Sequence, residues 1–239
     1  MISLSLVFPL FNQESNLPKL FVALEDYIRK QNYFALEVVF VDDGSTDNTY
    51  ELVFGFVEKH KEYSKFISYE ENKGRGYALR QGMLEVNGDW RLVLDPDLSA
   101  SLEEIEKLIP FINKGCQMII GSRYIQGSHV ETPPSLLRGI LGRSFIFLSN
   151  LILGLNVSDV SCGFKCFSKA SAQLILPKTK IDRWAHDAEN LYLAKKYKVK
   201  VCEVPLLWTN GQGTTIRVFR AVAQSFYDLL MIPFIHRKD

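Results

Sequence analysis

The chain has 239 residues, of which 47% are hydrophobic and 23% charged, and its formal net charge is +1 at pH 7. These proportions indicate a globular protein of one large domain, or a domain with a small appendage, and give no reason to expect nucleic-acid binding. No basic leader with a cleavage site precedes the first apolar run. No stretch reaches about 18 uninterrupted apolar residues, so we expect neither a secretory signal nor a transmembrane helix.

The small net charge hides an asymmetry between the two halves. Residues 1–120 hold 12 basic and 19 acidic side chains, a net −7, whereas residues 121–239 hold 16 and 8, a net +8. An acidic half that collects a cation and a basic half that meets an anionic partner would explain this difference, as would two ordinary solvated surfaces.

The four cysteines are Cys116, Cys162, Cys166 and Cys202. The spacing of Cys162 and Cys166 suits zinc, but no second pair or nearby histidine accompanies them. We therefore expect four free thiols in a reducing, cytoplasmic environment.

Apolar runs and amphipathic segments alternate through the first half of the chain. Ser101, with Glu104 three residues later, is predicted to form a capping box at the start of a helix that runs to about residue 113. Helices are also predicted after residues 16, 47 and 78, and strands at residues 3–8, 37–41, 65–69, 92–94 and 117–120. This alternation predicts an α/β fold with a mostly parallel sheet and helices on both faces.

The pattern changes after residue 121. Two segments, 136–155 and 217–236, mix large apolar residues with arginines. Each is too interrupted to span a bilayer, so we expect amphipathic helices in the headgroup layer of a membrane. The alternative is that one packs on the sheet and the other forms a dimer interface. A strand at residues 199–208 is also predicted.

Asp95 and Asp97 directly follow the apolar run at 92–94. Pro96 cannot donate to a sheet ladder, so the strand should stop at Asp95. Open α/β sheets bind ligands at the carboxyl ends of strands, where two carboxylates can share a hard cation such as Mg²⁺ or Mn²⁺. The alternative is a strand-to-helix loop with acidic turn residues.

Eight short motifs occur in the order found in the inverting family 2 glycosyltransferases of the GT-A fold, and the chain resembles this family over nearly its whole length. The first four motifs are residues 9–14 (PLFNQE), 41–47 (VDDGSTD), 72–76 (NKGRG) and 95–97 (DPD). The other four are residues 121–123 (GSR), 159–165 (DVSCGFK), 183–189 (RWAHDAE) and 203–206 (EVPL). The second set resembles the polyprenyl-phosphate branch, and residues 183–185 and 208–209 look most like its dolichyl-phosphate glucosyltransferases.

The resemblance implies a single GT-A domain over residues 1–239, with a nucleotide-sugar-binding half (1–121) and an acceptor-binding half (122–239). It implies a metal-dependent hexosyltransferase that uses UDP-glucose, or GDP-mannose as the next choice, and a polyprenyl phosphate acceptor. Such an enzyme would lie peripherally on the cytoplasmic face of a membrane, and homo-oligomerisation is left open. The alternatives are a transferase that acts on a glycan hydroxyl and a catalytically silent nucleotide-sugar-binding scaffold.

For the donor, the resemblance implies that Asp97 binds the metal and that Asp95 assists it or holds the ribose. Ser99 either adds a polar ligand or caps a helix, and Asp43 either contacts substrate or holds the turn. The remaining candidates for substrate binding in this half are Pro9, Phe11, Gln13, Glu14, Asp42 and Lys73. Gln13 stands where the family usually has Glu, and Lys73 lies in a turn type that is also common on surfaces.

For the acceptor, the two chemistries require different residues. A sugar hydroxyl needs a carboxylate base, whereas a lipid phosphate, with a second pKa of about 6, needs cations to position it. Asp159 and Asp187 are the catalytic candidates, either as a base or as groups that orient other residues. Arg123 and Arg138 are the preferred phosphate ligands, with Arg143 and Lys165 as further cations and Arg217 as a replacement for a lysine that the family carries nearby.

Overall fold

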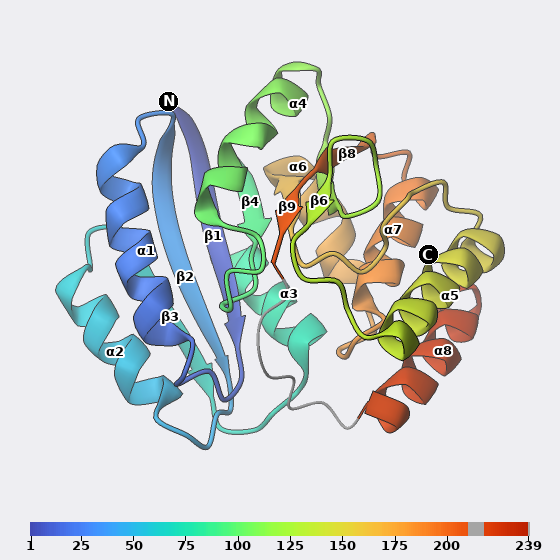
Figure 1. The fold of residues 1–239 in the computed structure, drawn as a ribbon, viewed down its shortest axis with the longest axis horizontal. Helices are drawn as coiled ribbons and strands as arrows, with labels where there is room; N and C mark the ends of the chain where they lie inside the picture. Colours follow the sequence, from blue (N-terminus) through green and yellow to red (C-terminus); the bar gives the residue numbers. More distant parts are fainter. Residues whose placement is uncertain (210–217, 239) are drawn as a thin grey trace.

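The computed structural model describes residues 1–209 and 218–238. For residues 218–222 it describes the backbone alone. Its described part contains a seven-stranded sheet of order β3-β2-β1-β4-β7-β5-β8 and a two-stranded sheet of β6 and β9 (Figure 1). The strands are β1 (Ile2–Leu10), β2 (Phe34–Asp43), β3 (Ser64–Tyr69), β4 (Trp90–Val93), β5 (Met118–Ser122), β6 (His129–Val130), β7 (Lys165–Ser168), β8 (Val201–Pro205) and β9 (Leu207–Trp208). In the large sheet β7 lies antiparallel between β4 and β5, and the other pairs are parallel.

Helices cover both faces of the large sheet, as the sequence predicts. The helices are α1 (Leu17–Lys30), α2 (Thr49–Lys59), α3 (Arg75–Glu85), the 3-10 helix η1 (Leu102–Leu108), α4 (Ile109–Asn113), α5 (Leu136–Leu153), α6 (Lys169–Ile175), the 3-10 helix η2 (Leu176–Lys178), α7 (His186–Lys196) and α8 (Val218–Ile235). The core on one face joins the sheet to α1, α2 and η1, and the core on the other joins it to α3, α6 and α7.

Strand β1 shows how the alternation of side chains builds these two cores. Leu4, Leu6 and Phe8 point into the core with α1, whereas Val7 points into the core with α3. Successive side chains of a strand face opposite sides of the sheet, so an apolar run with little alternation is typical of a strand buried on both faces.

The pairing of β4, β7 and β5 brings together the strand ends that form the site. Val93, the last residue of β4, and Ile120 in β5 both pair with Lys165, the first residue of β7. Since β7 runs in the opposite direction, its beginning lies at the same edge as the carboxyl ends of β4 and β5. The loops after Val93 and Ser122 and the loop before Lys165 therefore meet.

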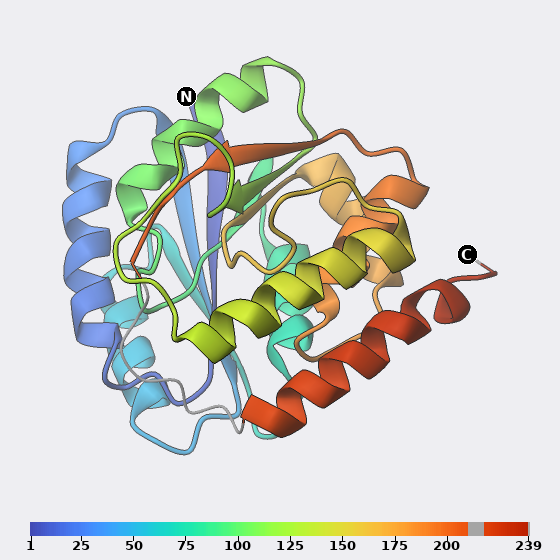
Figure 2. The same ribbon diagram turned by 45° about the vertical axis from the view of Figure 1, so that its right-hand side comes forward.

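Helices α5 and α8 lie side by side along the outer surface of the second half (Figure 2). Phe145 of α5 packs edge-on against Phe226 of α8, with ring centroids 5.6 Å apart. By length and composition alone, Leu136–Leu153 meets the criteria for a membrane-spanning helix, with a mean hydropathy of 1.5 and 17% of the segment buried. We expected no membrane-spanning helix because no apolar run is uninterrupted, but Arg138 and Arg143 do not lower the mean hydropathy of this segment below the criterion.

Two further expectations from the sequence are wrong. Cys116 and Cys202 form a disulfide, because the parallel pairing of β5 and β8 brings them together. Cys162 and Cys166 are free, as expected, and both are buried. Ser101 precedes a 3-10 helix and its side chain makes no capping bond. The Glu104 carboxylate instead accepts from Lys107 and from the Leu207 amide, which ties η1 to β9. Arg217 lies outside the described residues.

Candidate active site

The loops at the carboxyl ends of β1, β2 and β4 bring most of the predicted donor residues to one edge of the sheet. Asp42 and Asp43 end β2, and Asp95 and Asp97 follow β4. The parallel pairing of β1 with both β2 and β4 is the reason, because parallel strands end at the same edge. This is the edge at which open α/β sheets bind ligands.

A cleft of about 390 Å³ lies beside Asp42. Its lining includes Asp42, Ser45, Tyr50 and Ser68, which offer an aromatic ring and several polar groups. Asp42 is 2% exposed, and its Oδ1 accepts from the Ser45 amide at 3.1 Å. A flat heterocycle that carries donors and acceptors fits such a lining, because the ring can stack while the carboxylate accepts a hydrogen bond.

Asp43 holds the Gly-rich loop. Its carboxylate accepts from the backbone amides of Lys73 at 2.8 Å and Gly74 at 2.9 Å, and from the side chain of Asn72 at 2.9 Å. Of the two roles left open for Asp43, these contacts favour the turn. The ammonium of Lys73 lies over the rings of Tyr69 and Tyr77, 5.4 and 4.8 Å from their centroids.

The glycines of this loop allow a close approach between distant segments. A Cβ on Gly74, which has φ +110°, would lie 2.4 Å from the carbonyl oxygen of Asp182, and a Cβ on Gly76 would lie 2.8 Å from the Cβ of His186. The Asp182 carbonyl accepts from the Gly76 amide at 2.8 Å. The glycines thus place the first turn of α3 against the first turn of α7.

The predicted residues after β1 are largely engaged in local contacts. Pro9 is buried within β1 opposite Val41, and Phe11 is 40% exposed. Gln13 donates from its backbone to Thr49 Oγ1 at 2.7 Å, and Glu14 accepts from the Asn48 amide at 3.0 Å. These bonds join the β1 loop to the start of α2, whereas the side chain of Phe11 is exposed.

Asp95 and Asp97 have the chemistry of a site for a hard divalent cation. Burial and the charge of Asp95 raise the pKa of Asp97, and a cation relieves this repulsion. Within residues 1–209 and 218–238 no group of three or more His, Cys, Asp or Glu side chains is placed to hold a metal. Two carboxylates with substrate phosphates are a usual set for Mg²⁺, so Mg²⁺ or Mn²⁺ fits these residues. The Ser99 amide donates to Asp97 Oδ1 at 2.9 Å.

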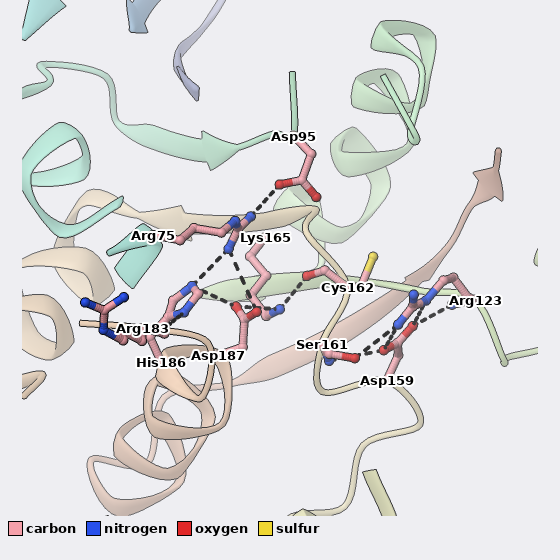
Figure 3. A network of polar contacts seen from close by, with 10 residues as sticks. All are labelled: Arg75, Asp95, Arg123, Asp159, Ser161, Cys162, Lys165, Arg183, His186 and Asp187. Carbon is pink, nitrogen blue, oxygen red and sulfur yellow. Dashed lines mark hydrogen bonds and ion pairs between the residues drawn. The ribbon is translucent and has the colours of Figure 1, made fainter. Parts of the chain in front are cut away.

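A network of charges continues from Asp95 toward α7 (Figure 3). Arg75 donates from Nη2 to Asp95 Oδ1 at 2.7 Å, and its Nη1 lies 3.0 Å from His186 Nε2 and 4.0 Å from Asp187 Oδ2. Asp187 Oδ1 lies 2.9 Å from Lys165 Nζ, and this ammonium also donates to the Cys162 carbonyl. The network therefore joins residues of α3, β7 and α7 with the loop after β4.

The environment keeps Asp187 ionised. Burial alone would raise its pKa, but the permanent charges of Lys165 and Arg75 oppose burial, and the pKa is lowered to about 2. Lys165 is completely buried, so its charge acts on Asp187 with little screening by solvent. A carboxylate in this state orients cations well and takes up a proton poorly at neutral pH.

His186 is neutral in the same network. Burial lowers its pKa to about 4, and the positive charges of Arg75 and Lys165 act in the same direction against the opposing effect of Asp187. Its Nδ1 lies 2.7 Å from the Arg183 carbonyl and therefore carries the proton, which leaves Nε2 to accept from Arg75.

Arg123 and Asp159 form a second cluster beside the first (Figure 3). Asp159 is completely buried, and Arg123 donates to its two oxygens from Nε at 2.7 Å and Nη2 at 2.9 Å. A bidentate pair of this kind has strong, directional hydrogen bonds. Arg123 could therefore bind a phosphate, and Asp159 act in catalysis, only while the two side chains remain paired or after the pair has opened.

The predicted cations of α5 are on the surface. Arg138 is exposed near the beginning of the helix, and Arg143 lies with its guanidinium 5.7 Å from the ring centroid of Tyr124. Arg123 contacts the same ring at 5.5 Å. Tyr124 thus joins Arg143 to the Arg123 cluster.

Sequence reasoning missed two residues of the network. Arg75 was visible only as the residue between the two glycines of the Gly-rich motif, and His186 as a residue between Ala185 and Asp187. The available signal was their place beside glycines and acidic residues at the beginnings of α3 and α7.

Known proteins resemble this chain in sequence and in fold. The model of the family described as "Glycosyl transferase family 2" matches residues 5–176. The dolichyl-phosphate beta-glucosyltransferase of Dictyostelium discoideum is 31% identical over an alignment of 247 positions, gaps included, that covers 98% of this chain and 74% of that protein. The human protein of the same name is 31% identical over 96% of this chain and 74% of its own length. The Saccharomyces cerevisiae protein of that name is 28% identical over 97% of this chain and 74% of its own length.

Solved structures of glucosyl-3-phosphoglycerate synthase from Mycobacterium tuberculosis have a similar fold. The complex with phosphoglyceric acid has a TM-score of 0.73 at 15% identity and covers 97% of this chain and 80% of that one. A complex of the same protein with Mn²⁺, UDP-glucose and phosphoglyceric acid has a TM-score of 0.70 at 15% identity and covers 96% and 79%. The predicted GT-A architecture, a mostly parallel sheet with helices on both faces, is confirmed.

Proposed function

This chain belongs to glycosyl transferase family 2 and is a hexosyltransferase, and from that premise we propose that it moves a hexose from a nucleotide diphosphate sugar to a polyprenyl phosphate at a membrane surface. The names of the relatives, dolichyl-phosphate beta-glucosyltransferases, support a polyprenyl phosphate acceptor and glucose as the transferred hexose. The similar synthase structure with UDP-glucose supports UDP as the nucleotide. GDP-mannose is the next candidate.

The acidic edge of the sheet supports the donor assignment. The cleft beside Asp42 offers room and polar groups for a nucleobase, and Asp95 and Asp97 offer two carboxylates that would hold Mg²⁺ or Mn²⁺ next to a diphosphate. A bound cation would stabilise the negative charge that develops on the leaving diphosphate. The similar synthase structures, which contain UDP with Mn²⁺ or Mg²⁺, also support this proposal.

The contacts of Asp187 are the observation that carries the acceptor assignment, because its carboxylate lies 2.9 Å from the buried Lys165 ammonium and 4.0 Å from the Arg75 guanidinium. With its pKa lowered to about 2, this carboxylate is a poor base for a sugar hydroxyl at neutral pH. A lipid phosphate, with a second pKa of about 6, arrives already deprotonated and needs no base. A phosphate oxygen can then form the bond to the anomeric carbon while the bond from that carbon to the diphosphate breaks on the opposite face, which inverts the configuration. Asp187 orients Arg75 and Lys165 during this step.

Basic groups and apolar surface support a membrane-bound phosphate as the acceptor. The guanidinium groups of Arg143 and Arg123 both lie near the ring of Tyr124, 5.7 and 5.5 Å from its centroid. Exposed large apolar residues continue from them along α5 and α8: Leu136, Leu137, Ile140, Phe147, Leu151, Tyr227, Leu230 and Phe234. Helices of this composition can lie in the headgroup layer and bring the site to a lipid whose tail stays in the bilayer.

A panel of donors and acceptors tests the proposal. The purified protein would be incubated with UDP-glucose, UDP-galactose or GDP-mannose, each with Mn²⁺ or Mg²⁺, and a short polyprenyl phosphate. The polyprenol of the same chain length is the matched acceptor, because it offers a hydroxyl in place of the phosphate. We expect glucosyl transfer to the phosphate only. Transfer to the polyprenol or to a water-soluble glycan, with none to the phosphate, would overturn the acceptor assignment.

A further inference from the structure

Arg75 lies between two carboxylates of the site. Its guanidinium contacts Asp95 at 2.7 Å on one side and lies 4.0 Å from Asp187 on the other. The side chain is 16% exposed, and Figure 3 shows it directed at Asp95 from the first turn of α3. A permanent positive charge thus lies beside one of the two proposed metal ligands.

The position of Arg75 is fixed by His186. The imidazole is buried, its Nδ1 donates to the Arg183 carbonyl at 2.7 Å, and its Nε2 accepts from Arg75 at 3.0 Å. The close approach at Gly76 brings the beginnings of α3 and α7 together. Because both helices are fixed at this point, His186 Nε2 and the Arg75 guanidinium are held next to each other. His186 therefore acts as a positioning residue through Arg75.

Asp95 is confined on its other side. A Cβ on Gly163 would lie 1.9 Å from Asp95 Oδ2, so this carboxylate oxygen rests against the backbone of the loop before β7. The carboxylate thus lies between Gly163 and Arg75. A divalent cation that coordinates Asp95 must share the carboxylate with the guanidinium or displace it.

We propose that Arg75, positioned by His186, competes with the divalent cation for Asp95 and turns to the diphosphate when the nucleotide binds. Like charges at a few Å repel strongly in a site of low dielectric, so Arg75 weakens binding of the metal alone. A diphosphate supplies anionic oxygens that attract both cations, and Arg is well suited to grip them. Metal and nucleotide are then taken up together, each increasing the affinity for the other by the same factor. The inference rests on the proposed function for the nucleotide diphosphate and the metal.

Direct binding of Mn²⁺ tests this without turnover or acceptor. Free Mn²⁺ would be counted by electron paramagnetic resonance during titration of the full chain, with and without UDP. We expect Arg75→Gln to bind Mn²⁺ alone about tenfold more tightly than the wild type and to gain about tenfold less from UDP. Arg75→Lys keeps the charge but cannot bridge two partners, and should fall between them. Arg80→Gln is the matched control, because Arg80 lies on the same helix and pairs with Asp182 at 2.6 Å.

His186 gives a second, independent measurement. His186→Leu removes the acceptor and should shift Mn²⁺ affinity in the direction of Arg75→Gln by a smaller factor. His186→Gln retains an acceptor oxygen and should stay near the wild type. Unchanged Mn²⁺ affinity and unchanged UDP coupling in both Arg75→Gln and Arg75→Lys, with native circular dichroism, would overturn the role of Arg75 and leave the proposed function intact. A wild type that takes up no Mn²⁺ even with UDP would overturn the metal assignment as well.

Discussion

The ammonium of Lys165 lies 2.9 Å from the carboxylate of Asp187, and the lysine is completely buried. Removing one partner of a buried ion pair costs more folding stability than replacing both, because the remaining buried charge then has no partner. Lys165 also donates to the Cys162 carbonyl, which anchors the loop between Asp159 and β7. The pair therefore both maintains the charge of Asp187 and holds the loop on which the site depends.

Asp97→Asn is expected to abolish nearly all metal-dependent transfer and to leave the fold intact. The amide keeps the shape of the side chain and removes the repulsion that raises the pKa of Asp97. Transfer and thermal unfolding of the variant would be measured with and without EDTA. Asp89→Asn, at an exposed aspartate before β4, is the matched control and should behave as the wild type. Full activity in Asp97→Asn, or wild-type activity that resists EDTA, would contradict the metal site.

Gly163→Ala is expected to impair metal use far more than stability. The added Cβ would meet the carboxylate of Asp95, whose Oδ2 is 1.9 Å and Cγ 2.7 Å from that position. The end of a side chain can move away at little cost in folding free energy, but the moved atom is a proposed metal ligand. We expect about a tenfold higher Mn²⁺ requirement and nearly unchanged thermal unfolding. Gly142→Ala, where an added Cβ meets nothing within 4 Å, is the control. Equal Mn²⁺ requirements in the two variants would argue against Asp95 as a ligand.

Arg123→Ala is expected to destabilise the protein, because it leaves the fully buried Asp159 carboxylate without its partner. Breaking a buried pair costs about 3–5 kcal/mol, and thermal or urea unfolding would measure the loss. Replacing both residues by Ala should cost less than the sum of the single changes. Arg143→Ala, at an exposed residue on the same tyrosine ring, should instead raise the KM for polyprenyl phosphate about tenfold without changing Tm. An Arg123→Ala variant as stable as the wild type would show that the pair contributes nothing.

His186 is expected to make stability depend on pH. Burial lowers its pKa from 6.5 to about 4, so between these values the unfolded chain binds a proton at this residue and the native protein does not. Stability therefore decreases as pH falls through that window, by up to about 3 kcal/mol, since each pKa unit is worth about 1.4 kcal/mol. Urea unfolding from pH 4.5 to 7 would measure this slope, which His186→Gln should reduce and His129→Gln, at an exposed histidine, should not. Parallel slopes for all three proteins would refute the prediction.

Membrane binding is expected to depend on one face of α5. Ile140, Phe147 and Leu151 are spaced at helical intervals and are 54%, 66% and 68% exposed, whereas Phe145 packs on α8. Changing the three exposed residues to Ser should reduce flotation with anionic liposomes, and added salt should reduce it further because the arginines interact with lipid charge. The control changes Val22, Phe54 and Leu174, which are exposed apolar residues elsewhere, to Ser. Equal flotation of the two triple variants would exclude α5 as the contact surface.

The sequence alone determined the parallel sheet and the edge at which the site lies. The apolar runs that end in Asp42 and in Asp95 indicate from the local sequence where each strand stops. Parallel strands then end at the same edge of the sheet. The amphipathic segment at 136–155 was recognisable for the same reason, because its composition is a local property. These features required no knowledge of which strands are neighbours.

The tertiary structure decided which charges pair. Arg75 and His186 are 111 residues apart, and Arg123 and Asp159 are 36 apart, so no local pattern contains either contact. Asp159 reaches Arg123 because β7 is inserted between β4 and β5, an order that composition and periodicity do not encode. The same insertion buries Lys165 beneath Asp187, and the resulting loss of solvent around both charges is what makes this carboxylate an orienting group and a poor base.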